Sequence, residues 1–145
     1  MASTRVGVVG LNYWGPNLAR NFGELAELAW ICDLDQDLLA RQAVRYPGAQ
    51  ATTSYDELLA DETLDAIIVA TPVPTHYALA KQALEAGKHV FVEKPPAMRA
   101  VEMEELVGLA AESELVLMPG HLLLYHPGVQ KVKHMIDAGS HGAFS

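Results

Sequence analysis

The 145-residue sequence contains a single cysteine, Cys32, which lies in an apolar, strand-like run. One thiol can form neither a disulfide framework nor the cysteine cluster of a zinc site. No cluster of lysine and arginine stands out and the net charge is −8, which argues against a nucleic-acid partner because a phosphate backbone attracts a basic face. No apolar run approaches a membrane span, and MASTRVGVVG lacks the charged-then-apolar pattern of a signal peptide. We therefore expect a cytoplasmic globular protein.

The chain does have enough apolar sequence to build a core. Half of its residues are hydrophobic and 19% are charged, which is typical of folded chains and not of disordered ones. Short apolar runs alternate with longer helix-periodic segments, and the first, fourth and fifth runs are continuously apolar, like strands buried on both faces of a parallel sheet. The predicted strands are Arg5–Val9, Leu28–Asp33, Gln50–Thr52, Ala66–Ala70, His89–Val92 and Leu115–Met118.

The segments between these runs are predicted to be helices. Asp35, Ser54 and Thr75 can each cap a helix, and Glu57 can complete a capping box with Ser54. The alternation of strands and helices indicates an α/β protein with a doubly wound, mostly parallel sheet and helices on both faces. Ligands of such sheets bind beyond the carboxyl ends of the strands. The predicted helices are Tyr13–Phe22, Gln36–Tyr46, Tyr55–Ala60, His76–Ala86, Ala100–Ser113 and Gly128–Ala138.

The stretch VGVVGLNYWGPN joins the first strand to the first helix. Gly10 and Gly15 match two of the three glycines of a dinucleotide-binding turn, whose N–H groups bind a pyrophosphate at a helix N-terminus. Asn12 replaces the middle glycine, and because Asn tolerates positive φ the turn can still form. Its amide can donate to the phosphate or crowd it. With Tyr13 and Trp14 these residues form a predicted cofactor loop; the alternative is a glycine-rich turn without a ligand.

Asp33, at the end of the second strand, tests this prediction independently. It lies 23 positions after Gly10, close to the roughly 20-residue spacing at which an acidic residue meets the adenosine ribose. A carboxylate there accepts from the ribose hydroxyls and repels a 2′-phosphate, and Asp35 adds to the repulsion. NAD is therefore favoured over NADP as the cofactor. The alternative is an aspartate that caps the next helix, a role that Asp35 can already fill.

Two later strand ends also carry candidate residues. Thr71-Pro72 turns the chain away from the sheet, where it can follow the ribose and nicotinamide end of a cofactor, and His76 faces either the cleft or solvent. Lys94, if partly desolvated at a strand end, can hydrogen-bond a substrate hydroxyl and lower the pKa of that hydroxyl for hydride loss. Glu93 can tune or position it. The alternative for Glu93 and Lys94 is an ion pair in solvent.

Several histidines follow the sixth predicted strand. His121 can reach a substrate, and His126 lies five positions later, which puts the two on different helix faces. No carboxylate completes a metal set, so no metal site is predicted. We interpret His126, His134 and His141 as ordinary polar residues.

The motifs GLNYWGPN, ICDLD, ATPVPTHY, AGKHVFVEKPPA and GHLLLYHPGVQKVKHMIDAG follow one another in the chain. Nearly the whole sequence thereby resembles the family of glucose–fructose oxidoreductase, inositol 2-dehydrogenase and the rhizopine-catabolism oxidoreductases (Gfo/Idh/MocA), and EKP is the most specific motif. The resemblance implies a Rossmann-like domain that binds NAD or NADP and hydride transfer at a hydroxyl carbon of a sugar, inositol or sugar nucleotide. It implies a catalytic role for Lys94 with Glu93 beside it, and a place for His121 near the nicotinamide and substrate. It also implies cofactor contacts at Gly10, Gly15, Asp33, Thr71, Pro72 and His76.

By the same resemblance, residues 1–120 form the dinucleotide-binding domain and residues 121–145 begin a substrate and dimerisation domain that is otherwise missing. That domain usually supplies an acid–base histidine, so we do not expect complete turnover by these residues alone. The surface it would cover can instead support self-association. Two alternatives remain: a stand-alone module that binds a nucleotide without chemistry, and a remnant with an empty cleft. Lys94 favours the dehydrogenase, because a pure binding module does not need it.

Overall fold

The computed structural model describes residues 3–139, and its strands form one six-stranded sheet. Every pairing is parallel, and the order is β3-β2-β1-β4-β5-β6. The chain therefore winds outward in one direction from β1 and in the other from β4, which confirms the predicted doubly wound α/β sheet. The strands are β1 (Arg5–Val9), β2 (Glu27–Cys32), β3 (Gln50–Thr52), β4 (Ala66–Val69), β5 (His89–Val92) and β6 (Leu117–Pro119).

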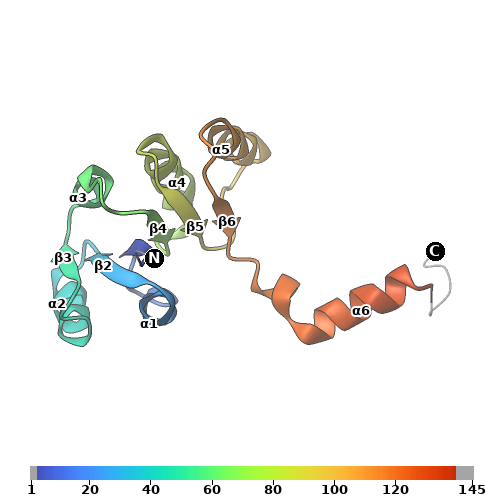
Figure 1. Ribbon diagram of the computed structural model, residues 1–145, viewed down its shortest axis with the longest axis horizontal. Helices are drawn as coiled ribbons and strands as arrows, with labels where there is room; N and C mark the ends of the chain where they lie inside the picture. Colours follow the sequence, from blue (N-terminus) through green and yellow to red (C-terminus); the bar gives the residue numbers. More distant parts are fainter. Residues whose placement is uncertain (1–2, 140–145) are drawn as a thin grey trace.

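Helices cover both faces of the sheet. Figure 1 shows α1 and α2 on one face and α3, α4 and α5 on the other, whereas α6 projects away from the body beyond β6. Within residues 3–139, no helix combines the length and apolar character needed to cross a lipid bilayer. The helices are α1 (Gly15–Leu25), α2 (Gln36–Arg45), α3 (Tyr55–Ala60), α4 (His76–Glu85), α5 (Ala100–Glu112) and α6 (Pro127–Asp137), with short 3-10 helices η1 (Val73–Thr75) and η2 (Leu122–Tyr125).

The central strands are buried on both faces because their side chains alternate between two hydrophobic cores. In β4, Ile68 packs with the core beneath α1 and α2, whereas Ile67 and Val69 pack with the core beneath α3, α4 and α5. All three are almost completely buried. A strand with this environment needs apolar residues at consecutive positions, which explains the continuous apolar runs of the sequence.

The helix ends follow the predicted signals only in part. The side chain of Asp35 accepts a hydrogen bond from the Leu38 N–H at 2.9 Å and caps α2 as predicted. Ser54 precedes α3 but makes no side-chain capping bond, so the predicted capping box is wrong. The Thr75 hydroxyl likewise does not cap α4 and bonds instead to the Pro72 carbonyl at 2.7 Å. The reason is that Thr75 ends η1, which runs directly into α4.

Candidate active site

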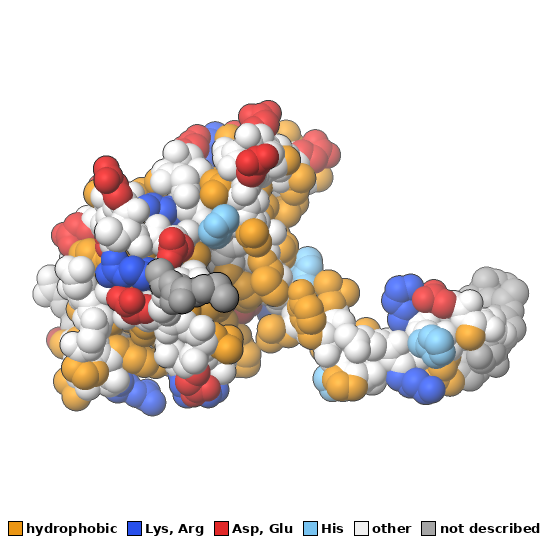
Figure 2. All heavy atoms as spheres, in the orientation of Figure 1, with side chains coloured by type: hydrophobic (Ala, Val, Ile, Leu, Met, Phe, Trp, Pro, Cys, Tyr) orange, Lys and Arg blue, Asp and Glu red, His pale blue; other side chains and the backbone are white. Residues whose placement is uncertain are grey.

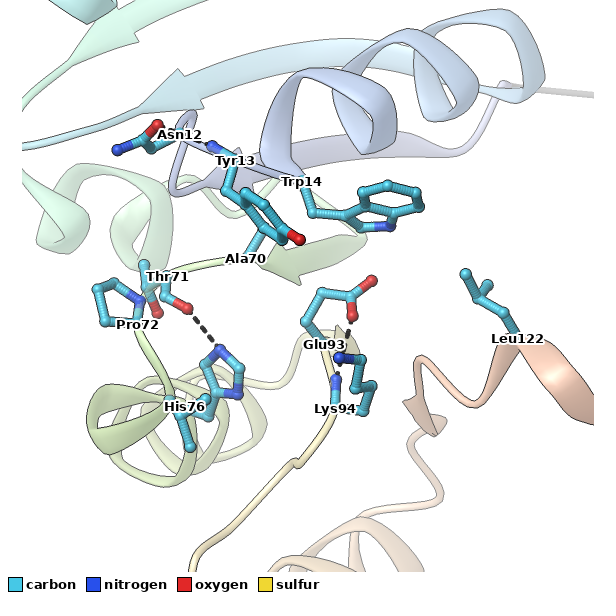
Figure 3. Close-up of a pocket in the computed structure, with 11 residues that line it drawn as sticks. Asn12, Tyr13, Trp14, Ala70, Thr71, Pro72, His76, Glu93, Lys94 and Leu122 are labelled. Carbon is cyan, nitrogen blue, oxygen red and sulfur yellow. Dashed lines mark hydrogen bonds between the residues drawn. The ribbon is translucent and has the colours of Figure 1, made fainter.

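A pocket of about 520 Å³ lies at the carboxyl edge of the sheet, beside the point where the strand order reverses. This is where doubly wound sheets bind their ligands. Figure 3 shows the turn after β1 on one side of the pocket, the exit of β4 on another, and Glu93 and Lys94 from the end of β5 between Trp14 and Leu122. The lining residues are Asn12, Tyr13, Trp14, Ala70, Thr71, Pro72, Val73, His76, Glu93, Lys94 and Leu122.

Two glycines make the turn after β1 possible. Gly10 has φ +89°, and a Cβ at that position would lie 2.6 Å from the carbonyl atoms of Ala70. A Cβ at Gly15 would lie 1.9 Å from the carbonyl oxygen of Gly10. Side chains at these positions would push the turn away from β4 and α1 away from the turn. The structure thus confirms the tight turn predicted at Gly10 and the close packing predicted at Gly15.

The residue between these glycines with positive φ is Tyr13, at φ +44°, and not Asn12. The idea that Asn12 replaces a glycine by adopting positive φ is therefore wrong. Asn12 instead accepts a hydrogen bond from the Tyr13 N–H through Oδ1 at 2.8 Å, which stabilises the left-handed residue locally. Because Tyr13 is left-handed, α1 begins at Gly15 and not at Tyr13 as predicted.

Asp33 lies directly against this turn, as its spacing predicts. Its Oδ2 accepts from the Leu11 N–H at 2.7 Å, and its Oδ1 accepts from the Asp35 N–H at 2.9 Å. The carboxylate therefore anchors the turn to the end of β2, a role that the spacing argument did not include. Each carboxylate oxygen has a second lone pair, so both can accept a further hydrogen bond from a ligand.

Glu93 and Lys94 differ sharply in their surroundings. Glu93 is 8% exposed; its Oε2 accepts from the Lys94 backbone N–H at 3.2 Å, and its buried Oε1 has no partner among the described residues. Gly120, at the end of β6, leaves room for it, because a Cβ there would lie 3.1 Å from Oε1. The Lys94 side chain is exposed, in contrast to the partial desolvation expected at a strand end. Among residues 3–139, no ion pair joins Glu93 to Lys94, so the solvent ion-pair alternative is not what the structure has.

His76 occupies the floor of the pocket and is 1% exposed. Its Nδ1 lies 2.8 Å from the Pro95 carbonyl oxygen and its Nε2 lies 2.6 Å from the Thr71 carbonyl oxygen. The sequence suggested either a cleft residue or a surface residue. The structure places it in the cleft and not at the surface, but both of its ring nitrogens are engaged by the chain itself.

The remaining predicted positions lie around the pocket. Gly10, Gly15 and Asp33 support the turn from behind and do not line the cavity. His121 is exposed and does not line it either, whereas its neighbour Leu122 does. Sequence reasoning missed Leu122 and Gly120, although their place after the sixth strand was the available signal. Across residues 3–139, no three His, Cys, Asp or Glu side chains are grouped so as to hold a metal ion.

Two further titratable groups lie outside the pocket. Burial raises the pKa of the Cys32 thiol to about 11, helped by the charges of Asp33 and Glu57, so this cysteine stays protonated at neutral pH. Hydrogen bonds from Thr63 and then from Trp30 lower the pKa of Asp61 from 3.8 to about 2. Asp61 lies at the opposite end of the sheet, in the loop before β4, where it accepts a hydrogen bond from the Trp30 ring and has a structural role.

The strand order and the glycine turn at its reversal point define a Rossmann-type domain. Residues 4–121 match the model of the GFO_IDH_MocA family, described as an oxidoreductase family with an NAD-binding Rossmann fold. The chain belongs to this family, in agreement with the resemblance carried by its motifs.

The curated relatives of this chain are considerably longer than the chain itself. It is 35% identical over 133 residues to UDP-N-acetylglucosamine 3-dehydrogenase of Acidithiobacillus ferrooxidans, covering 92% of this chain and 42% of that protein. It is 34% identical to dTDP-3,4-didehydro-2,6-dideoxy-α-D-glucose 3-reductase of Actinomadura kijaniata, covering 93% of this chain and 41% of that protein. The chain thus spans less than half the length of these curated relatives.

Two solved structures share the fold and were obtained with cofactors. GenD2 from gentamicin A biosynthesis, in complex with NAD, has a TM-score of 0.83 and 35% identity, over 88% of this chain and 37% of that one. KijD10, a 3-ketoreductase from Actinomadura kijaniata in complex with TDP-benzene and NADP, has a TM-score of 0.83 and 32% identity, over 94% of this chain and 44% of that one. Both nicotinamide cofactors therefore occur among the relatives.

Proposed function

We propose that this chain is the cofactor-binding part of an oxidoreductase that transfers a hydride between a nicotinamide cofactor and a hydroxyl carbon of a sugar nucleotide, sugar or inositol. One observation carries the proposal: Lys94 and the turn after β1 line the same pocket. A module that only holds a nucleotide needs the turn and does not need Lys94. The names of the relatives support a sugar-like substrate.

The residues around the pocket fit a dinucleotide. The N-terminus of α1 has no side-chain cap and no acidic residue in its first turn, so nothing from these positions neutralises its positive end. The two glycines allow the tight turn that leads into α1, and Asn12, Tyr13 and Trp14 of this turn line the pocket. Within the proposal, Gly10, Asn12, Tyr13, Trp14 and Gly15 hold the pyrophosphate side.

The other predicted cofactor residues would bind the adenosine end and the nicotinamide end of the dinucleotide. Asp33 would accept from the adenosine ribose hydroxyls while keeping its bonds to Leu11 and Asp35, and its charge would disfavour a 2′-phosphate. This is the basis for proposing NAD over NADP. Thr71 and Pro72, with His76 beneath them, would lie along the nicotinamide end.

The chemistry would centre on Lys94. When bound, the nicotinamide ring supplies the hydride acceptor or donor. The Lys94 ammonium group, exposed in the pocket, can donate a hydrogen bond to the substrate oxygen. It would stabilise the negative charge that this oxygen carries when its proton passes to a base, or when a hydride is added to the carbonyl in the reverse direction. Glu93 Oε1, buried and without a partner among the described residues, can accept a hydrogen bond from a bound ligand and help to orient it.

We further propose that residues 1–120 are the cofactor domain and that residues 121–145 connect it to a substrate domain. The support is that the described residues after Gly120 are almost entirely exposed although η2 and α6 carry leucine and valine side chains. His121 would approach the substrate from this connection. Without a covering domain, the same apolar side chains can pair with another copy of the chain.

The test of this function is Lys94→Ala in a protein that carries the second domain. We expect kcat to fall by about 10²–10⁴-fold with little loss of NADH affinity, because Lys94 would act on the reacting oxygen. Arg41→Ala, which removes an exposed cation on α2 outside the pocket, is the control and should leave kcat unchanged. Turnover that is unaffected by Lys94→Ala would show that Lys94 is a solvent lysine and takes no part in the reaction.

A further inference from the structure

The segment that carries Lys94 has few ways to be held in place. The last sheet hydrogen bond along it runs from the Glu93 N–H to the Val69 carbonyl at 2.9 Å. The Lys94 N–H then bonds to its own neighbour, Glu93, and the next two residues are prolines, which have no N–H. Beyond the strand, a carbonyl is therefore the polar backbone group by which a donor elsewhere can anchor this segment.

His76 provides such a donor position from the first turn of α4. Its buried ring lies between the Pro95 carbonyl, 2.8 Å from Nδ1, and the Thr71 carbonyl, 2.6 Å from Nε2. Thr71 follows β4 and Pro95 follows β5, and these two strands are neighbours in the sheet. Figure 3 shows the ring below the pocket with its contact to Thr71 drawn. One side chain thus connects the exits of both strands.

We propose that His76 is a positioning residue, which fixes the Pro95 carbonyl and thereby holds the adjacent Lys94 toward the pocket. The proposal rests on the catalytic role proposed for Lys94. This role differs from the direct cofactor contact predicted for His76. Both ring nitrogens contact backbone carbonyls, so the ring can affect a ligand only by fixing the segments that follow β4 and β5.

The chemistry of the two contacts gives this role a signature. Carbonyl oxygens only accept hydrogen bonds, whereas a neutral imidazole has a single N–H. A ring with one N–H donates to only one of the two carbonyls, and positioning of Lys94 requires the donor to be Nδ1, which faces Pro95.

Two substitutions separate the two contacts. The amide nitrogen of Asn can take the place of Nδ1, so His76→Asn keeps a donor for Pro95, whereas Gln reaches the place of Nε2, so His76→Gln keeps a donor for Thr71. The readout is the methyl NMR signal of Lys94 after reductive methylation of the lysines, assigned with Lys94→Arg. We expect the signal to stay in place in His76→Asn and to move in His76→Gln and His76→Ala.

Ring nitrogen NMR of the unmodified chain gives a second readout that needs no substitution. We expect Nδ1 to carry the proton that bonds to the Pro95 carbonyl. A spectrum in which Nδ1 lacks a proton at neutral pH would overturn the proposal, as would equal movement of the Lys94 signal in the Asn and Gln variants. The second result would mean that His76 only stabilises the fold.

Kinetics then separate this proposal from the proposed function. In a protein with the second domain, His76→Gln should lower kcat by about tenfold to a hundredfold, with KM for NAD nearly unchanged, because a small displacement of a catalytic group slows the reaction. His76→Asn should restore most of the rate. If Lys94→Ala leaves turnover unchanged, the catalytic role proposed for Lys94 fails, while the NMR result still decides whether His76 positions the segment.

Discussion

The body of the molecule and the segment that follows β6 use apolar residues in opposite ways. In the body, Leu58, Ile67 and Leu106 are completely buried. In the segment, Leu123 and Leu124 are 70% and 64% exposed, and no residue of η2 or α6 is buried. Figure 2 shows this segment standing clear of the body, with hydrophobic side chains at its surface. An apolar pattern predicts a helix, but the apolar side chains stabilise the fold only where another helix or strand packs against them.

The largest expected effect distinguishes these two regions. Leu106→Ala, in the core beneath α4 and α5, should lower the free energy of unfolding by about 2–5 kcal/mol, because it leaves a cavity between packed elements. Leu123→Ala, the matched change in the exposed segment, should alter it by less than about 0.5 kcal/mol. Denaturant unfolding measures both changes in the free energy of unfolding. Equal losses in the two variants would show that the exposed segment contributes to stability as much as the core does.

The glycine turn offers a second comparison inside the body. Gly15→Ala should destabilise the fold by several kcal/mol, roughly as other severe steric changes do, since its Cβ would overlap the Gly10 carbonyl. Gly48→Ala is the control, because a Cβ there meets no atom within 4 Å. Thermal unfolding of the two variants is the measurement, and a Gly15→Ala protein as stable as Gly48→Ala would show that the close packing is not needed.

A smaller, pH-dependent effect is expected at the opposite end of the sheet from the pocket. Hydrogen bonds from Thr63 and Trp30 hold the pKa of Asp61 at about 2, below the ordinary 3.8. A carboxyl with a lowered pKa stabilises the folded state above its unfolded pKa, and this stabilisation is lost as the pH falls from about 4 toward 2. Unfolding experiments across that window should show a shallower pH dependence in Asp61→Asn. An unchanged dependence would remove Asp61 from the acid response.

The fold was largely predictable because it depends on local patterns. Continuous apolar strands and intervening helices indicated the doubly wound sheet, and the spacing of Gly10 and Asp33 brought both to the same turn. The position of positive φ was not predictable, since Tyr13 adopts it through a local bond to Asn12. The role of His76 was also not predictable. Its partners are the backbone carbonyls of Thr71 and Pro95, and because every residue has a backbone carbonyl, the sequence carries no signal for them.

Titration of the chain with NADH, followed by nicotinamide fluorescence, tests the central claim most directly. We predict saturable binding to the wild-type chain, competed by NAD more strongly than by NADP. Asp33→Ala should weaken NAD more than NADP, because only NAD gains from the carboxylate at its ribose. A folded wild-type chain that leaves NADH fluorescence unchanged would contradict a cofactor-binding role for this domain.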